Sequence, residues 1–240
     1  MKAPPKAAMV LAAGLGKRLR PLTDGVPKPL VEVAGQPLIG HAIDRLALAG
    51  VERVVVNLHY KAAMIEAALF DRTHPRIEFS REGELLETGG GVKQALPLLG
   101  DIFFVLNGDV FWLDGVTTAL SRLVQYFESR RMDALLMMQR TVTAVGYDGI
   151  GDYFLDPLGT PRRRGEREVA PYIFAGVQIL HRRLFDGIED SVFSLKRLYD
   201  RAEDAGRLGA IIHDAEWFHI GTREGLEATR ARLASHRIER

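Results

Sequence analysis

Residues 9–30 place two glycines and several cations close together. Gly14 and Gly16 lack a Cβ, so the backbone there can take positive φ angles and let a bulky anion approach its N–H groups. Lys17 and Arg18 follow at once. Exposed N–H groups beside fixed positive charges suit a chain of phosphates. This segment therefore predicts a binding site for a polyphosphate.

Lys28 belongs to the same segment and stands between Pro27 and Pro29. The two prolines fix φ on either side and favour extended backbone at their neighbours, so this lysine has a stiff support. Two common phosphate-binding patterns do not fit the segment. Leu19 stands where a dinucleotide fingerprint needs its third glycine, and no Gly-Lys-Ser/Thr of a P-loop occurs.

Asp109 is a second candidate for chemistry, because it closely follows a strongly apolar run over residues 102–106. An acid at the end of a strand often does no more than form a turn or cap a helix. It is also where a ligand to a catalytic cation is expected. Residues 82–91 are a third candidate, since three consecutive glycines end that segment. Alone, they are typical of a flexible turn.

The segment 9–30 resembles the signature of sugar-1-phosphate nucleotidylyltransferases. Residues 11–23 read Leu-Ala-Ala-Gly-x-Gly-x-Arg-x-x-Pro-Leu-Thr, and residues 27–30 and 35–39 read Pro-Lys-Pro-Leu and Gly-Gln-Pro-Leu-Ile. The resemblance extends over nearly the whole chain. In length and motifs, the most similar subfamily comprises the N-acetylmuramate α-1-phosphate uridylyltransferases, which implies a role in peptidoglycan recycling of the cell wall.

The resemblance implies a role for residues in several segments. Those implied to bind the nucleotide are Leu11, Ala12, Ala13, Gly14, Gly16, Lys17, Arg18, Lys28, Glu82, Glu87, Thr88 and Gly89. Those implied to bind the sugar phosphate are Asn107, Gly151, Asp152 and Gly176. Those implied to be catalytic are Arg18, Lys28 and Asp109. Asp109 would also ligate Mg²⁺, and Glu82 would face the base, where an ionised carboxylate only accepts hydrogen bonds.

His219 departs from the family pattern in the segment 217–222, where relatives usually carry an aspartate that ligates the metal. Glu216 and Asp214 lie an odd number of residues away, so on a strand they face the other side. Imidazole suits Mn²⁺ or Co²⁺ better than Mg²⁺. Three outcomes are open: weaker Mg²⁺ binding, a shift to Mn²⁺ or Co²⁺, or loss of catalysis. We expect activity to survive, with His219 as a metal ligand.

The elements that must position these residues follow from the hydrophobic pattern. Strands are predicted over residues 8–12, 53–57, 77–80, 102–106, 133–139 and 172–180. Helices are predicted over residues 37–49, 61–70, 92–99, 113–130, 193–199 and 222–235. Such alternation favours a mostly parallel sheet covered on both faces, with ligands beyond the carboxyl ends of its strands.

The family resemblance makes this α/β fold more specific. It implies a Rossmann-like three-layer αβα nucleotidyltransferase fold, also called GT-A-like, with a mostly parallel central mixed sheet. Residues 1–240 would form a single domain. Its nucleotide-binding half would span about residues 1–110, and its sugar-phosphate-binding half about residues 111–240.

Composition excludes several other classes of protein. With 240 residues, 47% of them hydrophobic, the chain can bury a large core. A net charge of +1 gives no global field for nucleic acid, and no apolar run approaches a membrane span. The absence of cysteine fits a cytoplasmic protein. The basic cluster at residues 162–167 and Lys196 are weaker candidates near the sugar site, since charge runs are usually solvated. A monomer or small homo-oligomer is expected.

The expected reaction joins a nucleoside triphosphate, most simply UTP, to a sugar 1-phosphate such as N-acetylmuramic acid 1-phosphate, releasing pyrophosphate. The attacking phosphate is already an anion, so no general base is assigned. Arg18 and Lys17 would hold the leaving phosphates and Lys28 would neutralise the α-phosphate. Two alternatives stay open: thymidylyl, cytidylyl or guanylyl transfer to another sugar phosphate, and a nucleotide-sugar-binding regulator that has lost catalysis at His219.

Overall fold

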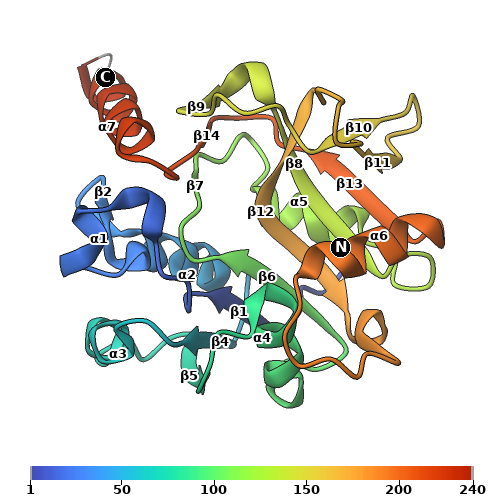
Figure 1. Ribbon diagram of the computed structural model, residues 1–240, viewed down its shortest axis with the longest axis horizontal. Coiled ribbons are helices and arrows are strands. Elements are labelled where there is room, and N and C mark those ends of the chain that lie inside the picture. The colour runs from blue at the N-terminus through green and yellow to red at the C-terminus, as the bar shows by residue number, and fades with distance from the viewer. Residues whose placement is uncertain (1, 239–240) are drawn as a thin grey trace.

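The computed structural model describes residues 2–238, with side chains through residue 235. Its centre is a nine-stranded mixed sheet (Figure 1). The strands of this sheet are β1 (Ala7–Leu11), β4 (Arg53–Leu58), β5 (Arg76–Arg81), β6 (Ile102–Asn107), β8 (Ala134–Arg140), β10 (Tyr153–Leu155), β11 (Pro161–Arg163), β12 (Tyr172–His181) and β13 (Leu208–Ile212). The neighbours β6-β1-β4-β5 are parallel. β12 runs antiparallel to β6 and β8, and β13 is parallel to β8.

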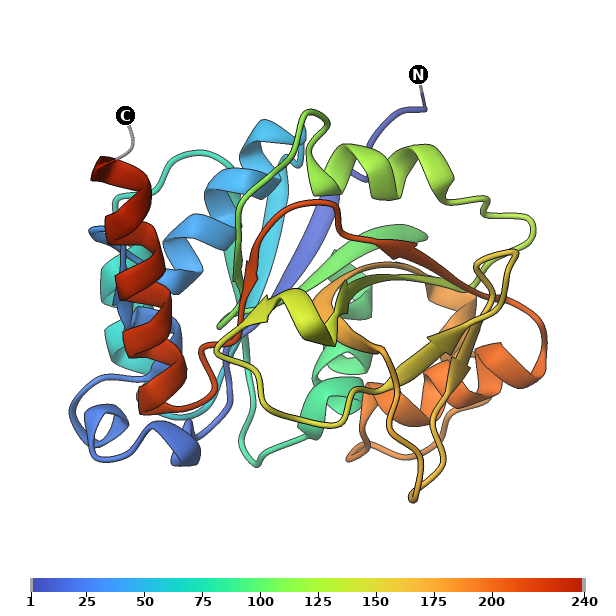
Figure 2. The ribbon, with the colours of Figure 1, turned by 90° about the horizontal axis from the view of Figure 1, so that it is seen from above.

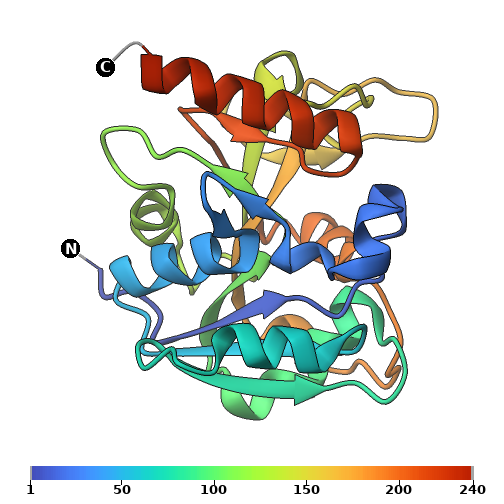
Figure 3. The ribbon, with the colours of Figure 1, turned by 90° about the vertical axis from the view of Figure 1, so that its left-hand side faces the viewer.

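Helices cover both faces of this sheet and give three layers. α2 (Leu38–Leu48), α3 (Ala62–Leu69) and α5 (Ala119–Tyr126) pack on one face. The core on the opposite face includes residues of α4 (Glu87–Ala95) and α6 (Leu195–Asp204). Figure 3 shows α2 and α3 lying along the parallel strands. The predicted α/β fold with a mixed sheet is therefore confirmed, and strands buried on both faces explain their continuous apolar runs.

The last helix, α7 (Arg223–Ile238), returns the chain to its N-terminal part, as Figure 2 shows. Leu226 joins a third apolar cluster with Leu19, Val33 and Phe218. The small strands near this helix are β2 (Glu32–Val33), β3 (Gln36–Pro37), β7 (Phe111–Trp112), β9 (Ala144–Val145) and β14 (Trp217–Phe218). None of the helices within residues 2–238 has an apolar stretch long enough to span a bilayer.

Most predicted elements agree with the structure, but two helices do not. The helix predicted over residues 113–130 is only α5, because Thr118 caps its start by accepting from Ser121 N–H at 3.3 Å. The helix predicted over residues 92–99 instead begins at Glu87 and includes the three glycines. Periodicity did not reveal the strand β13, which is five residues long.

The glycines of α4 pack against the segment that precedes α6. The N–H groups of Gly89 and Gly90 donate to the carbonyl of Phe193 at 2.8 and 3.1 Å. A Cβ on Gly89 would lie 2.3 Å from the Phe193 ring, and one on Gly90 would lie 2.0 Å from the Ser191 carbonyl. Gly89 and Gly90 therefore form a helix-packing surface, and residues 89–91 are helical rather than the flexible turn that three glycines alone suggest.

Candidate active site

A cavity of about 500 Å³ lies at the carboxyl ends of β1, β4 and β6. It is lined by every residue predicted to bind the nucleotide except Gly89. Asn107 and Asp109 also line it. We call this space the main cavity. The location agrees with the rule that open α/β sheets bind ligands beyond the carboxyl ends of their strands.

The loop after β1 forms one wall of the main cavity. Gly16 has a φ of 61°, and a Cβ there would lie 3.0 Å from the Thr23 methyl group. Thr23 in turn donates its hydroxyl to the Gly16 carbonyl at 2.9 Å. Gly14 does not have a positive φ, and a Cβ on it would enter open space. Only Gly16 is therefore required by the backbone conformation, whereas Gly14 leaves room in the cavity.

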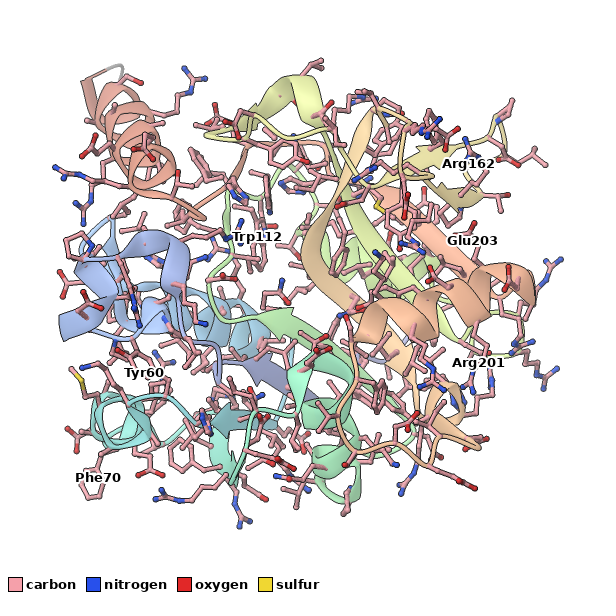
Figure 4. All side chains as sticks on the ribbon, viewed as in Figure 1. Tyr60, Phe70, Trp112, Arg162, Arg201 and Glu203 are labelled. Atoms are coloured by element: carbon pink, nitrogen blue, oxygen red, sulfur yellow. The ribbon has the colours of Figure 1, made fainter. Side chains whose placement is uncertain are left out.

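The loop is supported from outside by the short helix α1 (Leu22–Gly25) and by Tyr60, which lies between α1 and α3 in Figure 4. The Tyr60 hydroxyl donates to the Thr23 carbonyl at 3.0 Å. Leu19 is buried, whereas Lys17 and Arg18, which precede it in the same turn, are exposed. No ion pair is seen for these two cations in the described chain, so both are available to an anion.

Lys28 and Asp109 form an ion pair in the lining of the main cavity. The Nζ–Oδ2 distance is 2.5 Å, and their side chains are 11% and 33% exposed. Asp109 reaches this place because Gly108 lies against β1. The Gly108 N–H donates to the Leu11 carbonyl at 2.8 Å, and a Cβ on Gly108 would lie 2.7 Å from that oxygen. The structure thus brings together two of the three residues that the family resemblance implied to be catalytic, although they lie 81 residues apart in the sequence.

Glu82 lies on the opposite side of the main cavity and is held from two directions. Its Oε1 accepts from Asn57 Nδ2 at 2.7 Å, and its Oε2 accepts from Leu86 N–H at 3.1 Å. Thr88 is held as well, since its hydroxyl accepts from Leu195 N–H at 2.9 Å. This wall therefore offers fixed polar groups beside the apolar Leu85, an environment that suits a nucleobase.

His219 lies beside the main cavity rather than in its lining. Its ring stacks edge-on against Tyr147 at 5.5 Å between centroids, and a Cβ on Gly221, which does line the cavity, would lie 2.1 Å from its Nε2. Burial, together with the positive charges of Lys28 and Arg18, lowers the pKa of His219 below 6.5. The imidazole is therefore neutral at pH 7.

The donor set around Asp109 fits a hard divalent cation. No cluster of three or more histidines and acids that could hold a metal occurs among the residues that the structure describes. Mg²⁺ does not need such a cluster, because it commonly takes one or two carboxylates, substrate phosphates and water. Asp109 is partly exposed in the cavity and supplies one such carboxylate.

The residues predicted to bind the sugar phosphate divide between two places. Asn107 lines the main cavity, and a Cβ on Gly176 would lie 2.9 Å from Asn107 Nδ2. Asp152 lines a second cavity of about 270 Å³. Gly151 lines neither cavity; its N–H donates to the Tyr147 hydroxyl at 2.9 Å.

This second cavity lies between α6, β10, β11 and β12. Its lining is Asp152, Tyr153, Arg163, Arg164, Gly165, Glu166, Phe174, Lys196 and Tyr199. The bond from Leu195 to Thr88 joins the start of α6 to the wall of the main cavity. Lys196, the next residue of α6, lines the second cavity, so this bond links a wall of one cavity to the helix that lines the other.

The predicted basic cluster is largely tied up in the protein. Arg162 pairs with Glu168 at 2.9 Å and lies at the outer rim of the molecule in Figure 4. Arg163 pairs with Asp200 at 2.5 Å. Arg164 lines the second cavity and donates to the Gly151 carbonyl at 2.8 Å.

Comparison with known proteins agrees with this geometry. The sequence profile of the nucleotidyl transferase family matches residues 7–148. The chain belongs to the nucleotidyl transferase family. It is 42% identical over 240 residues to N-acetylmuramate alpha-1-phosphate uridylyltransferase of Caulobacter vibrioides, which covers 98% of this chain and 99% of that protein. The protein of that name from Neisseria meningitidis is 37% identical over 222 residues, covering 90% and 93%.

Solved structures give the same fold. HddC from Yersinia pseudotuberculosis, complexed with GMP-PN, has a TM-score of 0.77 at 24% identity, covering 95% of this chain and 99% of that one. The resemblance to sugar-1-phosphate nucleotidylyltransferases and the Rossmann-like architecture are therefore confirmed. Among the cavity residues of this nucleotidyl transferase, sequence reasoning missed Leu15, Pro29, Asn57, Leu85 and Gly221. Asn57 could have been found, because it is a polar residue near the end of the apolar strand β4.

Proposed function

We propose that this nucleotidyl transferase transfers a uridylyl group from UTP to N-acetylmuramic acid 1-phosphate and serves cell-wall recycling. The observation that supports transfer most is the meeting of Lys28, Asp109 and the exposed cations Lys17 and Arg18 around one cavity. The identity of base and sugar is supported by the two uridylyltransferases that match over almost the whole chain. The cytoplasm is the compartment we propose, because it supplies nucleoside triphosphates.

In the proposed reaction, a phosphate oxygen of the sugar 1-phosphate bonds to the α-phosphorus of UTP. The bond between that phosphorus and the oxygen bridging to the β-phosphate breaks, and pyrophosphate leaves with the electron pair. The attacking oxygen is already charged, so no proton has to be removed. Lys17 and Arg18 bind the leaving phosphates, and Lys28 reduces the negative charge around the α-phosphate.

Asp109 is the residue that would hold Mg²⁺, with Mn²⁺ or Co²⁺ as alternatives because of His219. A bound divalent cation lowers the repulsion between the two anionic substrates. Lys28 pairs with the same carboxylate. The Lys28 ammonium therefore lies where both the cation and the α-phosphate are expected. When the substrates bind, it can leave the Asp109 carboxylate and pair with a phosphate instead.

The second cavity is the place that we propose for the sugar. Phe174 and Tyr199 give it aromatic surface in edge-to-face contact, with 5.7 Å between their centroids. Lys196 makes no ion pair in the described chain and is the candidate contact for the carboxylate of N-acetylmuramic acid. Lys196→Met should then raise KM for this acid more than for N-acetylglucosamine 1-phosphate.

Pyrophosphate release from a panel of triphosphates and sugar 1-phosphates tests the proposal, with Mg²⁺ first and then Mn²⁺ and Co²⁺. UTP with N-acetylmuramic acid 1-phosphate should give the highest kcat/KM. The structural neighbour complexed with GMP-PN makes guanylyl transfer the second candidate, and a preference for GTP would establish it. If no pair of triphosphate and sugar 1-phosphate releases pyrophosphate, the protein is a nucleotide-sugar-binding protein without catalysis.

A further inference from the structure

Asn57 joins two walls of the main cavity. Its side chain is 3% exposed. Its Oδ1 accepts from Ala12 N–H at 2.7 Å, and its Nδ2 donates to Glu82 Oε1 at 2.7 Å. Ala12 begins the loop of glycines and cations, whereas Glu82 follows β5. One buried amide thus connects the wall that suits phosphates with the wall that suits a base.

The backbone fixes the direction of every hydrogen bond in this network. The Ala12 N–H can only donate, so the Asn57 atom that faces it is the oxygen, and the amide nitrogen must face Glu82. The Leu86 N–H donates to the other carboxylate oxygen of Glu82 at 3.1 Å. Both oxygens of Glu82 therefore receive a donor from the protein. The Glu82 carboxylate is therefore fixed in orientation, and its remaining lone pairs can accept hydrogen bonds from a ligand.

Gly91 leaves the space in which this pair sits. A Cβ there would lie 2.7 Å from Glu82 Oε1 and 2.9 Å from Asn57 Nδ2. Those separations are too short for a carbon atom in van der Waals contact. The third glycine of α4 therefore has a different role from Gly89 and Gly90, which pack against residues 191–193.

We propose that Asn57 is a positioning residue that sets base selection by fixing Glu82 as a hydrogen-bond acceptor in one place. A fixed acceptor distinguishes bases by where their N–H group lies, in the ring at N3 for uracil and outside the ring for the amine of cytosine. A carboxylate that is free to move could accept a hydrogen bond from either N–H group. This inference rests on the proposed function and names how the same cavity chooses its base.

The variant Asn57→Asp tests the idea at almost constant volume. The new carboxylate still accepts from Ala12 N–H but places a second negative oxygen against Glu82. KM for UTP should rise roughly tenfold or more while kcat at saturation changes about threefold or less. The ratio of kcat/KM for UTP to that for CTP should fall, an effect that a merely structural defect would not produce.

The double variant Asn57→Asp/Glu82→Gln supplies a second, independent measurement. Every hydrogen bond of the network can form again, with the direction of the bond between positions 57 and 82 reversed. The double variant should regain the melting temperature lost by Asn57→Asp. Position 82 now offers the cavity an N–H donor beside one amide oxygen in place of two carboxylate oxygens, so the preference for UTP over CTP should fall further or invert.

Gln139→Glu is the matched control, because Gln139 is another buried amide, 2% exposed, that donates to Thr143 at 2.8 Å away from the main cavity. The Gln139→Glu variant should have a lower melting temperature than the wild type. Its KM for UTP and its ratio of kcat/KM for UTP to that for CTP should stay unchanged. If the wild type transfers uridylyl groups but Asn57→Asp keeps its KM and base ratio, or the double variant keeps the wild-type ratio, the inference is wrong. A wild type without UTP-dependent transfer would instead overturn the proposed function.

Discussion

Lys28 and Asp109 show how much of this site depends on single side chains. Each neutralises the other in the protein without ligand, at 2.5 Å. We expect Lys28→Ala or Asp109→Ala to lower kcat by about a hundredfold or more, since removing one group that stabilises charge in a transition state costs roughly that much. Steady-state pyrophosphate release measures the change, with circular dichroism to verify the fold.

Lys6→Ala is the control for those two variants. Lys6 also forms an ion pair, with Glu52 at 2.7 Å, but both side chains are about two-thirds exposed, at 66% and 65%. Exposed pairs contribute little to stability, and this pair does not line the main cavity. The control should keep wild-type activity. If Lys28→Ala or Asp109→Ala also keeps it, these residues are not catalytic.

His219 is the residue that we propose as a second metal ligand, so it should affect which metal is preferred. Changing His219→Asp replaces a neutral ring with a hard, negatively charged oxygen ligand, so activity with Mg²⁺ should rise relative to activity with Mn²⁺ or Co²⁺. Titrating each metal into the assay gives the apparent affinity in each case. An unchanged metal profile would remove His219 from the metal site, in agreement with its place outside the cavity lining.

At the scale of elements, α4 shows why sequence reasoning found the segment but not its structure. Three glycines have low helix propensity, so the sequence favoured a turn. The helix forms because hydrogen bonds to Phe193 and close packing on residues 191–193 stabilise it. Contacts between segments a hundred residues apart leave no local signal. Asn57 does have a local signal, as a polar residue near the end of β4, but its bonds to Ala12 and Glu82 join segments that are distant in the sequence.

Gly90→Ala tests this packing role. The added methyl group would lie 2.0 Å from the Ser191 carbonyl, so α4 or the segment before α6 must move. Overpacking of this kind should lower the free energy of unfolding by about 1–3 kcal/mol. Urea denaturation measures the difference.

Gly14→Ala is the matched control for Gly90→Ala, because a Cβ on Gly14 meets no atom within 4 Å. Its stability should stay within about 0.5 kcal/mol of the wild type, while KM for the nucleotide rises because the methyl group enters the main cavity. Equal stability of the two alanine variants would contradict the packing role of Gly90.

For the whole molecule, buried histidines should make stability depend on pH. Burial lowers the pKa of His41 and of His213 below 6.5. The unfolded chain then binds protons at these positions at a higher pH than the folded chain does. Stability is therefore full above about pH 6.5 and falls as the pH drops below it. Thermal unfolding at pH 8, 6 and 5 measures this, and His213→Gln should weaken the dependence. A melting temperature constant over that range would contradict it.

At this scale, the sequence supported the fold class and the nucleotide side of the site better than the sugar side. Lys17, Arg18 and Lys28 could be predicted because they lie within one short motif, and Asp109 because it closely follows a strongly apolar strand. The second cavity, which we propose for the sugar, is assembled from α6, β10, β11 and β12. Its residues are scattered over residues 152–199, so Asp152 and Lys196 could be named from the sequence while Phe174 and Tyr199 could not.

Nucleotidyl transfer at the main cavity is tested most directly by following the phosphorus atoms themselves. Wild-type protein would be mixed with UTP, N-acetylmuramic acid 1-phosphate and Mg²⁺ and followed by ³¹P NMR. We expect both substrates to disappear together while equal amounts of pyrophosphate and a uridine diphosphate sugar form, and we expect neither product with Asp109→Ala. Release of inorganic phosphate without a diphosphate sugar, or full activity of Asp109→Ala, would contradict nucleotidyl transfer at this cavity.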